Sequence, residues 1–215
     1  MRLTLIIVVV FAEVVSWRIV ARPGRATEWN LMVGVSVLQG VVALVAWHVD
    51  LSTDAAPAVA IAVGLVSGAV LYAGTRVFVG VAVRWPVFRA HVADRYERAR
   101  QVPLPLALAL AVLLAVPGEE LFWRGFVQEL AGNHSSEVMG AAVALAGYIG
   151  VNAASGSLPL VAAAVVGGLT WGGLTLFTGG ILAAIVCHGV WTGLMLAHPP
   201  SAGRADTEPR EMMPL

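Results

Sequence analysis

The chain has 215 residues, of which 59% are hydrophobic and 12% charged, whereas a soluble domain has about 45 to 50% apolar and about 25% charged residues. This composition identifies an integral membrane protein. The formal net charge is +0, so no overall field attracts nucleic acid, and the single cysteine, Cys187, excludes an internal disulfide and a cysteine-built metal site.

The first apolar run, residues 3–20, is predicted to be a retained membrane helix rather than a signal peptide. It is longer than the apolar core of about 7 to 15 residues that signal peptides have, and it contains Glu13. The residues that follow, Ala21, Arg22 and Pro23, also make a poor cleavage site.

Apolar windows of about 20 residues, the length that crosses a hydrocarbon core of about 30 Å, recur along the chain. We therefore predict an all-α fold, a polytopic transmembrane helical bundle of about seven spans. The expected spans are residues 3–20, 29–47, 57–83, 104–130, 138–154, 158–177 and 181–197.

The arginines predict the orientation of this bundle, because loops rich in arginine stay in the cytoplasm. Three arginines follow the first span, namely Arg18, Arg22 and Arg25, and five follow the third, namely Arg84, Arg89, Arg95, Arg98 and Arg100. The charged residues of the loop between the second and third spans are Asp50 and Asp54. We expect the N-terminus outside and the C-terminal tail, with Arg204 and Arg210, in the cytoplasm. The expected location is a bacterial plasma membrane.

The polar segment 84–101 has two interpretations. Its apolar residues among five arginines fit an amphipathic helix at the cytoplasmic interface, held by anionic lipid; the other interpretation is a solvated loop whose arginines only fix the topology. We divide the chain into an N-terminal three-helix membrane region with this loop (1–102), a helical core (103–198) and a disordered tail (199–215).

Small residues at four-residue spacing permit close contact between membrane helices. Three such pairs give weak support for a compact bundle: Gly64 with Gly68, Gly168 with Gly172, and Gly189 with Gly193.

Two adjacent carboxylates and an arginine, Glu119, Glu120 and Arg124, lie inside the fourth predicted span. Each charged group at membrane depth costs about 2.5 to 3.5 kcal/mol on insertion scales, so the cluster needs a use or a partner. Glu120 and Arg124 are at i and i+4 on a helix and can pair, while Glu119 is turned by about 100°. Glu119 is then free to accept a proton from water; the alternative is an ion-pair network that only locks helices together.

Later spans add further polar side chains. His188 lies in the middle of the last predicted span, and Thr192 lies one turn later on the same face. In the fifth predicted span, Asn152 lies one turn after Tyr148. A base, a histidine and amide or hydroxyl donors on three helices are the groups needed to activate water and stabilise an oxyanion. Each polar side chain alone is also a common interhelical hydrogen-bonding group.

Two intramembrane charges remain, Glu13 and Arg76. We expect either that the two side chains pair with each other or that the side chain of Arg76 extends to the membrane interface.

The segment Glu119-Glu120-Leu121-Phe122-Trp123-Arg124 resembles the EExxxR motif of the CPBP family of CAAX proteases and bacteriocin-processing enzymes, which includes the type II CAAX prenyl endopeptidases. The family's second motif, FxxxH, is similar to the stretch from Tyr148 to Asn152. Its third motif, HxxxN or HxxxD, is similar to the stretch from His188 to Thr192. The resemblance covers residues 104–197.

This resemblance implies a membrane-embedded endopeptidase in which Glu119 is the general base, Glu120 and Arg124 orient it and His188 is a catalytic donor. Asn152 stands where the second motif has histidine, and Thr192 where the third has Asn or Asp. The resemblance leaves a divalent metal such as zinc open, but the chain keeps only one of the two motif histidines and its ligand set does not support zinc. The implied partners are membrane lipid and a peptide or protein substrate, and no nucleic acid.

The departures at Asn152 and Thr192 keep a second function open, a non-catalytic family member that binds a membrane partner or confers immunity to a bacteriocin. A third hypothesis, a small proton-coupled transporter that uses Glu119 and Glu120, has less support, because the sequence shows neither repeat halves nor interrupted helix pairs.

Overall fold

The structure, a computed structural model, describes residues 1–21 and 28–200. Within these ranges the regular secondary structure is helical throughout, which confirms the all-α prediction. Several predicted features lie outside the described residues: Arg22, Arg25, Arg204, Arg210 and positions 201–215 of the predicted disordered tail.

Each predicted span corresponds to a helix. The helices are α1 (Arg2–Val20), α2 (Glu28–Val42) with the π-helix η1 (Ala43–Trp47), α3 (Pro57–Ala82), the continuous helix Leu104–Asn133, α8 (Glu137–Ala153), α9 (Leu158–Thr178) and α10 (Leu182–Ala197). The continuous helix is made of α5 (Leu104–Leu108), η2 (Ala109–Ala115), α6 (Val116–Glu120), η3 (Leu121–Gln128) and α7 (Glu129–Asn133).

Five of these helices are long and apolar enough to cross a membrane. The other two, α8 and α10, are apolar but have 17 and 16 residues, somewhat short of the usual length of about 20 residues. The prediction of about seven spans is therefore approximately right among the described residues.

Proline and glycine set several helix ends. Pro57 opens α3, and Pro159 lies in the first turn of α9, where its missing N–H costs no helical hydrogen bond. Gly179, with φ 66°, ends α9 in the left-handed conformation that glycine adopts readily. These signals explain why the predicted boundaries agree with the observed ones within a few residues.

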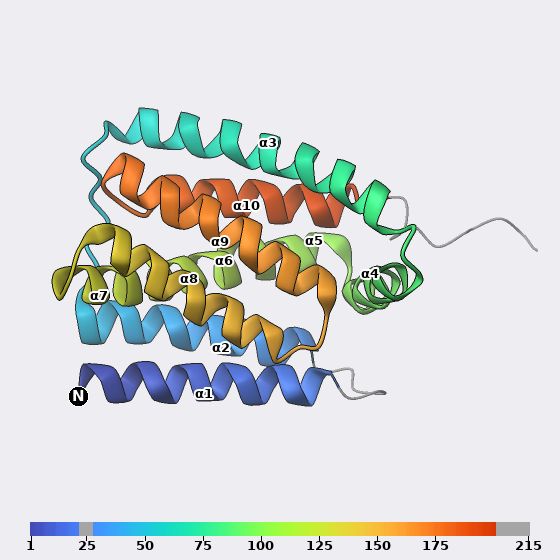
Figure 1. The fold of residues 1–215 in the computed structure, drawn as a ribbon, viewed down its shortest axis with the longest axis horizontal. Helices are drawn as coiled ribbons and strands as arrows, with labels where there is room; N and C mark the ends of the chain where they lie inside the picture. The colour runs from blue at the N-terminus through green and yellow to red at the C-terminus, as the bar shows by residue number, and fades with distance from the viewer. Residues whose placement is uncertain (22–27, 201–215) are drawn as a thin grey trace, which may run out of the picture.

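The long helices lie side by side along one direction, with α1 and α2 on one side of the bundle and α3 on the other (Figure 1). One core holds them together: Val9 of α1, Ala43 of η1, Phe126 of η3, Tyr148 of α8 and Trp171 of α9 all belong to it. The boundary drawn between regions 1–102 and 103–198 stays a prediction, and this core takes residues from both sides of it.

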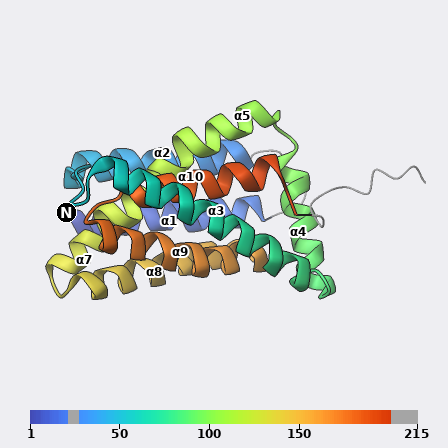
Figure 2. The ribbon, with the colours of Figure 1, turned by 90° about the horizontal axis from the view of Figure 1, so that it is seen from above.

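The segment after α3 forms a helix, α4 (Pro86–Ala99), that crosses one end of the bundle (Figure 2). Of the two interpretations of this segment, the helix is the one observed. Its apolar residues Phe88 and Val92 are buried against Val79 at the end of α3, so this face covers the bundle instead of facing lipid. Burial also raises the pKa of Tyr96 on α4 above its ordinary value.

Two of the predicted glycines allow α3 and α10 to touch closely. A Cβ at Gly64 would lie 2.8 Å from the carbonyl oxygen of Ala183, and one at Gly68 the same distance from the carbonyl oxygen of Cys187. Because Cys187 precedes His188, this contact also fixes the height of the histidine in the bundle.

Large apolar side chains cover the outside of the bundle. Phe11 of α1 is 67% exposed, Val70 of α3 66% and Phe177 of α9 76%. Such broad apolar exposure is unfavourable in water and fits a surface that faces lipid. Together with the long apolar helices, this exposed apolar surface identifies an integral membrane protein.

Candidate active site

The carboxylate cluster lies in the middle of the continuous helix Leu104–Asn133. Pro117 has no N–H to donate and would normally break or kink a helix. Here the turns on either side of α6, η2 and η3, take the wider π-helical form, which accommodates such an interruption and is frequent at functional sites. The helix therefore continues and carries Glu119, Glu120 and Arg124 into the core.

Gly118 lets α2 approach α6 backbone to backbone. A Cβ at this position would overlap the carbonyl oxygen of Ser36 and lie 2.6 Å from its carbonyl carbon. On the α2 side, a Cβ at Gly40 would lie 3.2 Å from the Cα of Gly118. This contact places Ser36 next to Glu119.

Glu119 is held by two neutral hydroxyl groups. Tyr148 donates its hydroxyl to Oε2 at 3.1 Å, and the hydroxyl of Ser36, which is shared with the carbonyl oxygen of Met32 at 2.9 Å, lies 3.4 Å from Oε1. The side chain is partly exposed, whereas that of Glu120 is fully buried. The two adjacent carboxylates thus differ both in their exposure to solvent and in their hydrogen-bond partners.

Glu120 belongs to a buried charged network with Arg124 and His188. Nε of Arg124 lies 3.4 Å from Oε2 of Glu120, which confirms the predicted i, i+4 pair, and Nδ1 of His188 lies 2.7 Å from Oε1. The three side chains are nearly inaccessible. Buried charges need such pairing, because a lone buried charge would be strongly destabilising.

Aromatic rings enclose this network. The ring of Trp171 stacks on that of His188 with 3.7 Å between centroids, and the guanidinium of Arg124 lies 4.8 Å from the ring centre of Tyr148 and 5.3 Å from that of Trp171. The stacking limits rotation of the imidazole, and the cation–π contacts help to stabilise Arg124 out of water.

The closest polar contacts of Glu120 are with Arg124 and His188. Glu120 faces His188 from one side and Arg124 from the other, while the hydrogen bonds of Glu119 come from α2 and α8. The reason is geometric, since neighbouring side chains on a helix point about 100° apart. Glu120 therefore contacts both Arg124 and His188, and the role of Glu120 and Arg124 at the site stays a prediction.

Asn152 is buried, but its amide donates to the carbonyl oxygen of Tyr148 one turn earlier in its own helix, at 2.9 Å. Thr192 lies one turn after His188 and is partly exposed. No hydrogen bond to Glu119, Glu120 or His188 is found for either residue in the described part of the chain. Their predicted roles at the site stay predictions.

A second buried carboxylate lies close to the site. Glu13 of α1 accepts a hydrogen bond from Nε2 of Gln39 at 2.8 Å and interacts electrostatically with Glu119. Arg76 instead donates to the hydroxyl of Tyr72 at 2.9 Å. Direct pairing of Glu13 with Arg76, one of the two arrangements expected, is therefore not the one observed.

Sequence reasoning missed three contributors to this site: Ser36, Gln39 and Trp171. A serine, a glutamine or a tryptophan in an apolar helix is too common to indicate function. Gly118 was the usable signal, because a glycine directly before the carboxylate pair of a membrane helix indicates close approach of another backbone.

The residues present at this site do not fit a zinc ion. Searching the described residues reveals no group of three or more His, Cys, Asp or Glu side chains that could hold a metal. Nδ1 of His188 already contacts Glu120, and the guanidinium of Arg124 lies on the same carboxylate, so a second cation there would be repelled.

Comparison with models of protein families matches residues 101–194 to the type II CAAX prenyl endopeptidase Rce1-like family. The matched region contains the carboxylate pair, Arg124, Asn152, His188 and Thr192. Comparisons with curated proteins and with solved structures give no match.

Proposed function

We propose, from the membership of residues 101–194 in the Rce1-like family of type II CAAX prenyl endopeptidases, that this integral membrane protein hydrolyses a peptide bond with a water molecule activated by Glu119. The observation that carries the proposal is the division of the carboxylate pair. Glu120 is buried and neutralised by Arg124, whereas Glu119 is partly exposed and its hydrogen bonds among the described residues come from hydroxyl groups.

In the proposed reaction Glu119 removes a proton from water as the water oxygen attacks the carbonyl carbon of the scissile bond. The carbon–nitrogen bond of the resulting tetrahedral intermediate then breaks, and the proton held by Glu119 passes to the leaving amine. Tyr148 and Ser36 keep the carboxylate in place through both steps, as general acid–base catalysis requires.

His188 is the proposed donor to the oxyanion. Its Nδ1 is held by the carboxylate of Glu120 and its ring is stacked on Trp171, so in the protonated ring the second N–H, on Nε2, is left to donate to a substrate oxygen. A pre-oriented donor of this kind stabilises developing charge at little reorganisation cost. Glu120 and Arg124 act through the histidine and are positioning residues.

The test uses the full chain purified in detergent and an internally quenched, farnesylated peptide that ends in a CAAX sequence. Glu119→Gln is expected to lower kcat by a factor of about 10² to 10⁴, the usual contribution of a general base. Glu129→Gln is the matched control, because it makes the same change at an exposed position of the same helix. A Glu119→Gln variant with the wild-type rate would disprove the mechanism.

The proposed orientation follows from the ends of the bundle. Of the nine described arginines, six lie at the end where α1 and α3 stop and α4 crosses: Arg18, Arg84, Arg89, Arg95, Arg98 and Arg100. Arg2 begins α1 at the other end, where Asp50 and Asp54 lie in the loop before α3. The positive-inside rule places the arginine-rich end in the cytoplasm and the N-terminus outside.

A specific observation favours a second function, a non-catalytic protein that binds a membrane partner or gives immunity to a bacteriocin. The amide of Asn152 donates to the carbonyl oxygen of Tyr148 in its own helix, so among the described residues the second motif reaches Glu119 through the hydroxyl of Tyr148 and not through the position where the family has histidine. Under this hypothesis the farnesylated peptide is not cleaved, and cells that carry Glu119→Gln resist a bacteriocin as well as cells that carry the wild-type chain.

A further inference from the structure

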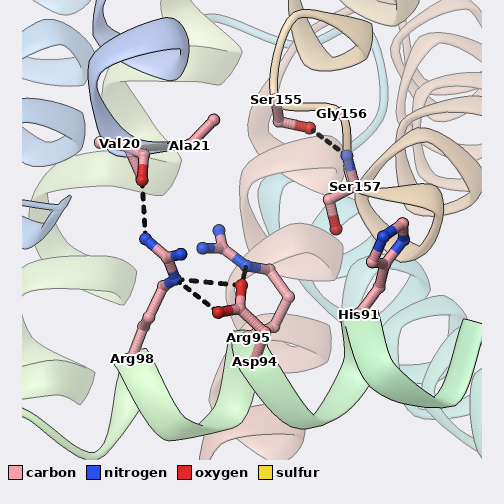
Figure 3. Close-up of a pocket in the computed structure, with 9 residues that line it drawn as sticks. All are labelled: Val20, Ala21, His91, Asp94, Arg95, Arg98, Ser155, Gly156 and Ser157. Atoms are coloured by element: carbon pink, nitrogen blue, oxygen red, sulfur yellow. Dashed lines mark hydrogen bonds and ion pairs between the residues drawn. The ribbon is translucent and has the colours of Figure 1, made fainter. Parts of the chain in front are cut away.

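A polar cavity of about 230 Å³ lies at the arginine-rich end of the bundle (Figure 3). It is enclosed by the end of α1, by one side of α4 and by the loop between α8 and α9. None of the residues proposed for catalysis lines it. It is therefore a separate site.

The lining carries more positive than negative charge. Arg95 and Arg98 of α4 bring two guanidinium groups, which lie next to each other in Figure 3, and Asp94 brings one carboxylate. Nε of Arg98 donates to both oxygens of Asp94, at 3.1 and 3.0 Å, and Nε of Arg95 lies 3.8 Å from Oδ2. One carboxylate is thus shared by two cations.

A further bond holds Arg98 in place. Nη1 of Arg98 donates to the carbonyl oxygen of Val20 at 2.7 Å, at the end of α1. Arginine loses less conformational freedom on binding when its planar head is fixed in advance. The cavity is therefore prepared for an anion before the anion arrives.

The opposite wall supplies neutral donors. The hydroxyl of Ser157 is buried and has no hydrogen-bond partner within the described residues, which is an unfavourable state for a hydroxyl unless a ligand or water completes it. His91 accepts the backbone N–H of Leu158 on Nδ1 at 3.3 Å, so the neutral ring carries its proton on Nε2. The N-terminus of α9, which begins at Leu158, adds partial positive charge.

The position of the cavity points to the source of the anion. Because α4 crosses the end of a bundle of spanning helices (Figure 2), it lies at the level of the lipid headgroups. Clusters of arginine at this level attract anionic lipids, and guanidinium groups bind phosphate oxygens with strong charge-assisted hydrogen bonds.

We infer that this cavity binds a phosphate group, and that the phosphate is the headgroup of an anionic lipid. The guanidinium of Arg95 and the hydroxyl of Ser157 donate to the phosphate oxygens. Asp94 and Val20 hold Arg98 beside them.

The test uses the full chain in neutral detergent. Lipid bound to the intact protein is measured by native mass spectrometry with phosphatidylglycerol, with the zwitterionic phosphatidylcholine and with inorganic phosphate. Wild type is expected to bind phosphatidylglycerol at least tenfold more tightly than phosphatidylcholine. Binding of inorganic phosphate as well would show that the phosphate alone is recognised, and its absence would show that the lipid is required.

Two variants and a control decide whether the cavity is responsible. Arg95→Gln is expected to weaken phosphatidylglycerol binding about tenfold, the size of one hydrogen bond to a charged group. Ser157→Ala is expected to weaken it severalfold without changing any charge. Arg89→Gln, which removes the same charge from an exposed position of α4 outside the cavity, is expected to bind as wild type.

Equal binding of the two lipids by wild type would overturn the inference. So would equal losses in Arg95→Gln and Arg89→Gln, because they would show that only the overall charge of α4 matters. Ser157→Ala keeps the inference testable if Arg95→Gln does not fold, since unchanged binding in the serine variant would also count against the cavity.

Discussion

Gly118→Ala tests whether the contact between α2 and α6 builds the site. The added methyl group would overlap the backbone of Ser36, and its distance of 2.6 Å from the carbonyl carbon means that the two helices must separate by about 1 Å. Overpacking usually costs about 1 to 3 kcal/mol. We expect about 3 kcal/mol, because the clash is with backbone and no side chain can rotate away.

For a chain of this size, 1 kcal/mol lowers the midpoint of thermal unfolding by about 2 to 4 °C, so we expect a decrease of about 6 to 12 °C. The separation should also break the hydrogen bond from Ser36 to Glu119 and slow cleavage of the farnesylated peptide. Gly150→Ala is the matched control, because nothing lies within 4 Å of the added methyl group. If Gly118→Ala unfolds at the wild-type temperature, the backbone contact is not as the structure describes it.

Three further predictions concern the network and the packing around it. Tyr148→Phe removes the hydroxyl that bonds to Glu119, and we expect kcat for the peptide to fall about tenfold with KM unchanged; a change in KM alone would assign Tyr148 to substrate binding. Glu120→Gln leaves a buried arginine without its carboxylate, which should lower the free energy of unfolding by about 3 to 5 kcal/mol in denaturant titrations, and a loss below 1 kcal/mol would contradict this pairing. Gly68→Ala should lower the thermal midpoint because its methyl group meets the α10 backbone, whereas Gly74→Ala on the same helix meets nothing within 4 Å; equal midpoints would refute the close contact.

The sequence predicted the helices well because lipid imposes a simple rule. Apolar windows of sufficient length must become helices, since no other open structure satisfies its backbone in a membrane. The pair of Glu120 with Arg124 was predictable for a similar reason, because both residues belong to one helix and its geometry fixes their distance.

Contacts between helices were harder to predict. The bond from Ser36 to Glu119 joins residues 83 positions apart, and nothing in either helix alone specifies which face of α2 meets α6. The hydrogen bond that the structure shows for the amide of Asn152 was hard to predict for a related reason. Its amide can be satisfied by its own helix, and sequence spacing does not distinguish that bond from one to a neighbouring helix.

The packing of α2 against α6 also limits which segments can be exchanged between related proteins. The region that matches the family model starts at residue 101, yet Ser36 comes from α2, and α1 and α2 supply the neighbouring pair of Glu13 and Gln39. A chimera joined at residue 101 would keep every motif and still replace half of the surroundings of Glu119. The motif region is therefore not a portable module, and exchanges between relatives should preserve Gly40, Ser36 and Gly118 as one set.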